Sequence, residues 1–166
     1  MDELGTIYQM NRIIGPVCLA MAWSCEVTVA QNFAGFAHYN SADLAAKEKE
    51  IVRKVNGNRP SFVVLGKTAG TTSALIYRAA TGEAELHENE SDFFVVRSGH
   101  ATLVIGGRLK DSRVTGPGEL AAASIEGGER RPIAAGDVVY IPAKLPHHVL
   151  IERGAPILYL IIKAKE

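Results

Sequence analysis

The last two thirds of the sequence, from about Ser61 onward, predict an all-β domain folded as an antiparallel sandwich or barrel. This region breaks into short runs rich in β-branched and aromatic residues, most runs are separated by glycine, and no helical period lies between them. Many short strands at regular spacing, without intervening helices, are typical of such folds. The expected strands span residues 61–65, 73–79, 83–89, 93–98, 101–105, 123–126, 137–141, 148–151 and 157–163.

The N-terminal segment, residues 1–30, predicts a secretory signal peptide. Arg12 precedes an uncharged and mostly apolar run over residues 13–25, and small residues follow at Thr28 and Ala30, where a signal peptidase reads. The run is shorter than the roughly 20 apolar residues that a transmembrane helix needs. We therefore expect the mature chain to be periplasmic or secreted.

The start of this signal peptide is left open by the sequence. The acidic residues Asp2 and Glu3 are foreign to the basic start of a signal peptide, and a translation start at Met10 would exclude them. Cleavage before Gln31 would remove both cysteines of the chain, so we expect no disulfide in the mature protein.

Residues 31–60 predict an irregular lead-in followed by one amphipathic helix. Ser41 is the expected N-cap, and Leu44, Ile51 and Val52 recur on one helical face. The β domain then takes up residues 61–166.

Charge and hydropathy indicate which partners to expect. The 166 residues include 18 Lys and Arg against 18 Asp and Glu, so the formal net charge is zero. A nucleic-acid binder normally shows a basic excess, and we expect a small-molecule ligand and no nucleic acid. The runs 93–96 and 157–162 are apolar on both faces of the expected strands. This predicts that another sheet or a second subunit covers them, and a homodimer is consistent with it.

Two glycine-bounded stretches carry the most informative residues. In the first, His87 is followed by Asp92, which stands seven residues before Gly99. In the second, Pro142 stands five residues before His147.

These stretches, residues 82–99 and 136–147, resemble the two signature motifs of the cupin superfamily. The resemblance implies a cupin-type double-stranded β-helix, which is a jelly-roll-like barrel, and it implies a metal site inside that barrel. The sequence departs from the family pattern where Asn89 replaces the second motif histidine, where Lys144 replaces a glycine and where Ile151 replaces an asparagine.

Carried over to this sequence, the resemblance makes His87, Asp92 and His147 metal ligands, with Asn89 as a fourth ligand. Two imidazoles and one carboxylate form a set that Fe(II) uses, and Mn(II), Zn(II) and Ni(II) also accept it. We expect one divalent metal and leave its identity open.

The alternation of side chains along a strand supports a polar pocket. Glu85, His87 and Asn89 fall on one face of the expected strand, and an inward-facing polar set needs partners such as a metal or a ligand. If that face points outward, no partner is needed. Glu85 and Tyr140 are the expected substrate-binding residues, whereas His148 should point away from His147.

The sequence leaves two functions open. The favoured one is an exported metal-dependent cupin enzyme that acts on a small polar organic molecule by oxygenase, isomerase or lyase chemistry. The alternative is a non-catalytic exported cupin barrel that binds a carbohydrate or another metabolite without metal. Residues 110–132 predict a long loop, either a lid or a surface insertion.

Overall fold

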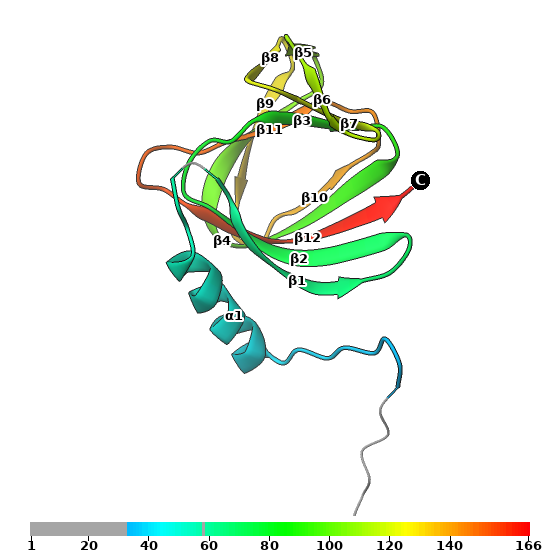
Figure 1. Ribbon diagram of the computed structural model, residues 1–166. Coiled ribbons are helices and arrows are strands. Elements are labelled where there is room, and N and C mark those ends of the chain that lie inside the picture. The colour runs from blue at the N-terminus through cyan, green and yellow to red at the C-terminus, as the bar shows by residue number, and fades with distance from the viewer. Residues whose placement is uncertain (1–32, 58) are drawn as a thin grey trace, which may run out of the picture. The chain divides into compact units, whose positions relative to one another are not determined.

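The computed structural model describes residues 33–57 and 59–166, and the segment expected to be a signal peptide lies outside these residues. The unit formed by residues 34–166 is mostly β, with a curled antiparallel half-barrel and one helix that precedes it (Figure 1). No helix in the described part of the chain has the length and apolar character needed to cross a membrane.

Helix α1, Ser41–Arg53, is capped by Asn40. The Asn40 side chain accepts hydrogen bonds from the backbone N–H groups of Ala42 (2.9 Å) and Asp43 (3.0 Å). The Asp43 carboxylate in turn accepts from the Asn40 backbone at 3.1 Å, which completes a capping box. The expectation that Ser41 is the N-cap was therefore wrong by one residue, because the Asn40 carboxamide satisfies the first helical amides.

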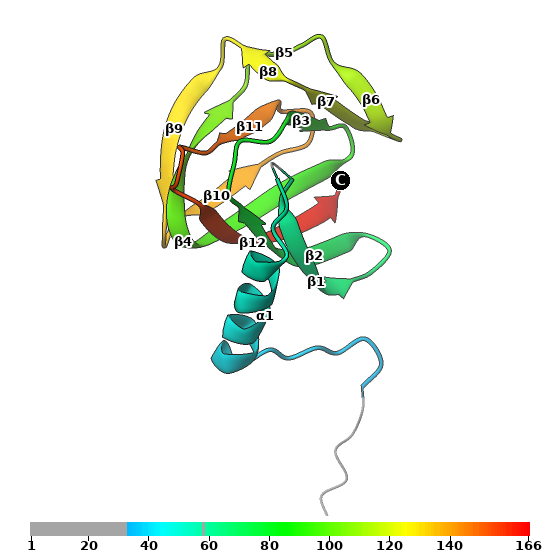
Figure 2. The same ribbon diagram turned by 60° about the vertical axis from the view of Figure 1, so that its left-hand side comes forward.

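The strands of the half-barrel form one ten-stranded sheet and one two-stranded sheet. In the larger sheet the hydrogen-bonded order is β1-β2-β12-β4-β11-β3-β7-β6, and β9 and β10 pair with β4 in addition; β5 and β8 form the smaller sheet (Figure 2). All pairs are antiparallel. The strand bounds are β1 Ser61–Lys67, β2 Thr71–Arg78, β3 Ala84–His87, β4 Glu90–Ile105, β5 Arg108–Lys110, β6 Arg113–Gly116, β7 Glu119–Ala122, β8 Ser124–Glu126, β9 Glu129–Ala134, β10 Val138–Ile141, β11 His147–Leu150 and β12 Ile157–Lys165.

Strand β4 runs through the position where the sequence predicted a break between two strands. Gly99 adopts a φ of 78°, and the register against β12 shifts beside it, since Leu158 pairs with Ser98 whereas Tyr159 pairs with Val96. Up to Gly99 β4 pairs with β12, and over residues 92–95 also with β10, whereas from His100 onward β4 pairs with β9 and β11. The bend at Gly99 thus lets one strand belong to both parts of the curled sheet.

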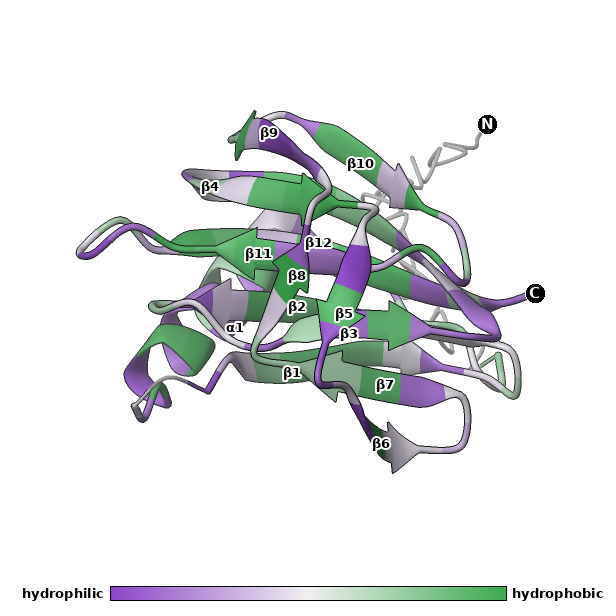
Figure 3. Ribbon diagram, turned by 90° about the horizontal axis from the view of Figure 1, so that it is seen from above, coloured by the Kyte–Doolittle hydropathy of each residue, from purple (hydrophilic) through white to green (hydrophobic). Residues whose placement is uncertain are grey.

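The prediction of a long loop over residues 110–132 was wrong. Strands β6 and β7 form a hairpin there, β7 pairs with β3, and β9 pairs with β4. Strand β9 is hydrophilic over most of its length (Figure 3) and contains Pro132. It was not predicted because it lacks the alternation of apolar and polar residues, and because proline is rare inside strands.

The core lies on the concave side of the sheet, and α1 covers part of the opposite side. Tyr159 and Ile161 belong to the large inner cluster, whereas Leu158 and Leu160 pack with Ile51 of α1. The two-sided apolar run of β12 is therefore covered by a helix of the same chain, where the sequence suggested a sheet or a second subunit. The buried inner cluster comprises Ala74, Phe94, Val96, Ala101, Leu103, Ile133, Ile141, Val149, Ile157, Tyr159 and Ile161.

Candidate metal centre

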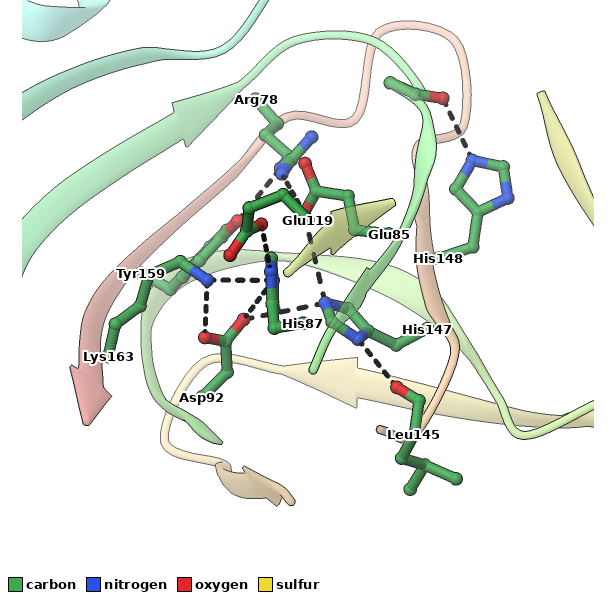
Figure 4. A network of polar contacts seen from close by, with 11 residues as sticks. Arg78, Glu85, His87, Asp92, Glu119, Leu145, His147, His148, Tyr159 and Lys163 are labelled. Carbon is green, nitrogen blue, oxygen red and sulfur yellow. Dashed lines mark hydrogen bonds and ion pairs between the residues drawn. The ribbon is translucent and has the colours of Figure 1, made fainter. Parts of the chain in front are cut away.

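A cavity of about 240 Å³ opens on the concave side of the half-barrel. Apolar side chains of the core, among them Ile76 and Phe94, form part of its wall. The rest is polar, and most of these polar side chains gather in Figure 4. They are Arg78, Glu83, Glu85, His87, Asp92, Glu119, His147, Tyr159 and Lys163.

Strand pairing brings the three histidine and aspartate residues of the sequence motifs together. His147 of β11 pairs with Glu85 of β3, two residues before His87, so His87 and His147 lie on adjacent strands. Asp92 reaches the same point from β4, and its Oδ2 lies 3.5 Å from the Nε2 atoms of both imidazoles. All three side chains are buried, with exposed fractions of 7% for His87, 3% for His147 and 2% for Asp92.

The hydrogen bonds of the two imidazoles fix which nitrogen faces the cavity. His87 Nδ1 lies 2.5 Å from Glu119 Oε2, and His147 Nδ1 lies 3.2 Å from the carbonyl oxygen of Leu145. Because a carboxylate and a carbonyl oxygen only accept, each Nδ1 carries a proton, so in the neutral rings Nε2 holds the lone pair. An N–H donated to a carboxylate or a carbonyl oxygen is the usual arrangement behind a metal-ligating histidine.

His147 Nε2 is buried and has no hydrogen-bond partner among the described residues. A buried nitrogen lone pair without a partner is costly, and a metal ion would satisfy it. Glu85, His87 and His147 each offer one ligand atom within 4.8 Å of the others, and His147 Nε2 lies 3.9 Å from Glu85 Oε2. This group of two buried histidines and one partly buried glutamate could therefore hold a metal ion.

Asp92 is the electrostatic centre of the site. Burial alone would raise the pKa of its carboxyl group, but the contacts with His147, His87 and Lys163 outweigh burial and hold the pKa well below its usual range. Burial alone would likewise lower the pKa of His87, and the interaction with Asp92 is the main reason that this pKa is instead raised.

Lys163 contributes a cation to the same atoms. Its Nζ donates to Asp92 Oδ1 at 2.7 Å and to His87 Nε2 at 2.8 Å (Figure 4). The lysine reaches this place because Lys163 of β12 pairs directly with Asp92 of β4, so both side chains leave the same face of the sheet.

A second polar pair forms another part of the cavity wall. Arg78 Nε donates to the Tyr159 hydroxyl group at 2.9 Å, and an Arg78 Nη atom lies 3.8 Å from Glu85 Oε2. Burial raises the pKa of Tyr159, so this side chain acts as a neutral hydroxyl group. Arg78 thus contacts Tyr159 and approaches Glu85, whereas Lys163 forms the ion pair with Asp92.

The loop before β11 is tied to the site by Lys144. This residue has a φ of 67° in the left-handed region, at the position where the cupin motif has a glycine. Its backbone N–H donates to the carbonyl oxygen of His87 at 2.7 Å. The backbone conformation of the motif is therefore kept without the glycine, although a side chain in this region costs about 1 kcal/mol.

Not every residue expected at the site lines the cavity. Asn89 lies in the turn after β3, beyond the point where strand alternation applies, and it is exposed. Tyr140 is 57% exposed, contacts the Phe93 ring, and donates to a Glu166 carboxylate at 3.0 Å. Neither is among the described residues that line the cavity, whereas Glu85 is.

His148 points away from the cavity, as alternation predicted. It is buried on the other side of β11, where Nε2 lies 2.9 Å from the carbonyl oxygen of Gly82 (Figure 4). This histidine therefore has a structural partner of its own.

Sequence reasoning missed five of the polar wall residues, one of which is Glu83, at the same parity as Glu85 and His87. Lys163 and Tyr159 share the inward parity of Ile161 on β12, and Arg78 shares that of Ile76 on β2, so alternation carried a usable signal for these three. Glu119 carried none, because its strand was not predicted.

No protein-family model matches the chain, and no curated protein matches it. Among solved structures the chain is similar to TT1209 from Thermus thermophilus, with a TM-score of 0.50 and 18% identity over 71% of this chain and 93% of that chain. KdgF from Halomonas sp. has a TM-score of 0.48 and 12% identity, over 68% of this chain and 84% of that chain. A cupin superfamily protein from Desulfitobacterium hafniense has a TM-score of 0.47 and 12% identity, over 68% of this chain and 83% of that chain.

These likenesses concern the fold. The antiparallel topology, the positions of the two motifs and the likeness to TT1209 agree with the fold class predicted from the sequence. The curled antiparallel half-barrel, with both motifs facing one cavity, is the cupin-like fold that the sequence predicted, and its histidine and glutamate group could hold a metal ion.

Proposed function

We propose that this chain binds one divalent metal ion in the cavity and acts on a small polar organic molecule, by oxygenase, isomerase or lyase chemistry. The observation that carries the proposal is the Nε2 atom of His147, which is buried without a hydrogen-bond partner among the described residues and faces Asp92 and Glu85. Buried polar atoms without a partner are rare in folded proteins, and a metal ion would satisfy this one.

His87, His147 and Asp92 would hold the metal ion, with Glu85 as a further carboxylate ligand. Two imidazoles with carboxylates suit Fe(II), Mn(II), Zn(II) and Ni(II). When bound, such an ion supplies Lewis-acid polarisation of a substrate oxygen. Asn89 and Tyr140, which the sequence also suggested for the site, have no part in this proposal because both are exposed away from the cavity.

The other residues of the cavity would bind and orient the substrate. Glu119 holds the His87 ring in one tautomer, so that Nε2 stays available. Arg78 offers a fixed cation to an anionic or polar group of the substrate, because its Nε bond to Tyr159 holds the guanidinium group in place. Glu85 is only partly buried and could accept a proton from a bound molecule.

A second candidate function is binding of a carbohydrate or another metabolite without metal. Lys163 favours it, because its ammonium group already neutralises Asp92 and bonds to His87. Asp92 thus has a cation of the chain beside it even without a metal ion.

Elemental mass spectrometry of protein produced from Gln31 onward separates the two candidates. We expect close to one Fe, Mn, Zn or Ni per chain, and its loss in the His87→Ala/His147→Ala double variant. His148→Ala is the matched control, since it removes a buried histidine from the same strand outside the cavity and should keep the metal. Wild-type protein that stays empty even after addition of each metal would leave only the metal-free binding function.

We further propose that the chain is a homodimer and is periplasmic or secreted. Strand β1 is an edge strand with Phe62 61% exposed and Val64 45% exposed, which supports pairing of two copies along this edge. Light scattering behind a sizing column would test the dimer. Export rests on residues 1–30, and cell fractionation would test it. The net charge of zero supports a small-molecule ligand over nucleic acid.

A further inference from the structure

Lys163 contacts side chains to which the proposed metal ion would bind. Its Nζ lies within hydrogen-bond distance of both Asp92 Oδ1 and His87 Nε2, and its side chain is 27% exposed. The two acceptors belong to two of the proposed ligands. The lysine therefore contacts the metal ligands directly, not merely the rim of the cavity.

The lone pair of His87 Nε2 cannot serve two cations at once. His87 Nδ1 donates its proton to Glu119, so the neutral ring has a single lone pair, and that lone pair accepts the hydrogen bond from Lys163. A metal ion bound to Nε2 needs the same electron pair. Binding of a metal ion to His87 and the contact between Lys163 and His87 therefore exclude each other.

The charge of the cavity leads to the same exclusion. Asp92 is 2% exposed, and its carboxylate needs a cation close by, which Lys163 supplies through a direct ion pair. A divalent ion on Asp92 would supply that charge in place of the lysine and would repel a neighbouring ammonium group. Both effects favour displacement of Lys163 when a metal ion enters.

We propose that Lys163 and the divalent metal ion are alternative partners of Asp92 and His87, so that Lys163 lowers the metal affinity of the site and is released into the cavity when the metal binds. This inference rests on the proposed metal centre. Lysine has a flexible four-carbon stem that allows the ammonium group to move while the backbone of β12 stays paired with β4. The metal ion in such a site is exchangeable, because the Lys163 ammonium group can replace it as the partner of Asp92 and His87.

Isothermal titration of Zn²⁺ and Mn²⁺ into metal-free wild-type protein, Lys163→Met and Lys163→Arg tests the exclusion. A charge-assisted hydrogen bond changes an equilibrium constant roughly tenfold to a hundredfold. We therefore expect Lys163→Met to bind metal at least ~10-fold more tightly than wild type, and Lys163→Arg to stay within a few-fold of wild type because it keeps the competing cation. A lysine that only supports the shape of the site would give the opposite sign, namely weaker binding in Lys163→Met.

A second measurement follows the lysine itself. Brief acetylation followed by peptide mass spectrometry should show that Lys163 becomes more reactive when Zn²⁺ is added, because its two acceptors are lost. Lys144 and Lys165, both exposed, serve as internal references whose reactivity should not change. A metal ion that merely blocked access would lower the reactivity of Lys163, which contradicts the proposal.

The outcomes also separate this inference from the proposed function. If wild type and Lys163→Met bind metal equally well, the metal centre stands and the exclusion is refuted. If neither protein binds metal, the metal centre is refuted and the inference with it. Binding by Lys163→Met alone would support both.

Discussion

Replacing Gly99 by alanine should destabilise the protein far more than the same replacement at Gly154. Both glycines have nearly the same left-handed backbone, with φ of 78° and 79°. At Gly154 an added Cβ atom has no neighbour within 4 Å, whereas at Gly99 it would lie 1.9 Å from the carbonyl oxygen of Pro156 and 3.0 Å from Ile157 Cα. The pair of variants therefore isolates the steric overlap from the backbone preference.

The size of the effect follows from these two contributions. Alanine in the left-handed region costs about 1 kcal/mol, which is the whole effect expected at Gly154. At Gly99 the overlap is with backbone atoms next to a paired strand, so β4 or the start of β12 must move by about 1 Å, and overpacking of this kind costs roughly 1–3 kcal/mol or more. We therefore expect Gly99→Ala to lose about 2–4 kcal/mol, a large part of the 5–15 kcal/mol typical of a domain.

Equilibrium unfolding in guanidinium chloride, followed by circular dichroism, measures the difference. The midpoint of Gly99→Ala should fall well below that of Gly154→Ala, with unchanged slopes if both variants unfold in two states. Equal losses in the two variants would refute the reasoning, because they would mean that the bend in β4 yields to a methyl group without cost.

Two predictions concern pH. Asp92→Asn should lower the free energy of unfolding by about 3 kcal/mol at pH 7, because it leaves Lys163 without its charged partner. The pKa of Asp92 is lowered in the folded protein, so the stability that its carboxylate contributes is present above the unfolded pKa of about 3.9 and is lost as the pH falls. The stability gap between wild type and Asp92→Asn should therefore narrow below about pH 4, and denaturant titrations at pH 7 and pH 3 would reveal a constant gap if this is wrong. Metal content after dialysis should decline as the pH falls through the raised pKa of His87, because a protonated imidazole does not bind a metal ion. Full occupancy at pH 5 would count against imidazole ligation.

The fold was predictable where a strand carries a run of large apolar residues that pack in the core. Strand β12 was detectable through its apolar run, and β10 through Val139 and Ile141, which pack into the core or against it. Strands β6 and β9 stayed hidden because most of their side chains are exposed, as Val114 at 77% shows, and such strands leave no apolar alternation to detect. The join at Gly99 was hidden for another reason, since a glycine between apolar runs looks the same whether it ends a strand or bends one.

The sequence predicted three side chains that meet at the candidate site, but it did not predict the charge balance around them. Spacing within the two motifs singled out His87, Asp92 and His147, and the structure brings these side chains together. The spacing within the motifs did not reveal that Lys163 would neutralise Asp92. That contact depends on the register between β4 and β12, which pairs residues 71 positions apart in the sequence.

The position of β12 has a consequence for how the protein assembles. This strand lies between β2 and β4 in the sheet, yet the ribosome makes it after every other described strand. Until β12 is available, the edges of β2 and β4 that it will occupy have no partner, and unpaired apolar edges invite association with other chains. The same step delivers Tyr159 and Lys163 to the cavity, so closure of the sheet and completion of its polar wall are a single event in folding.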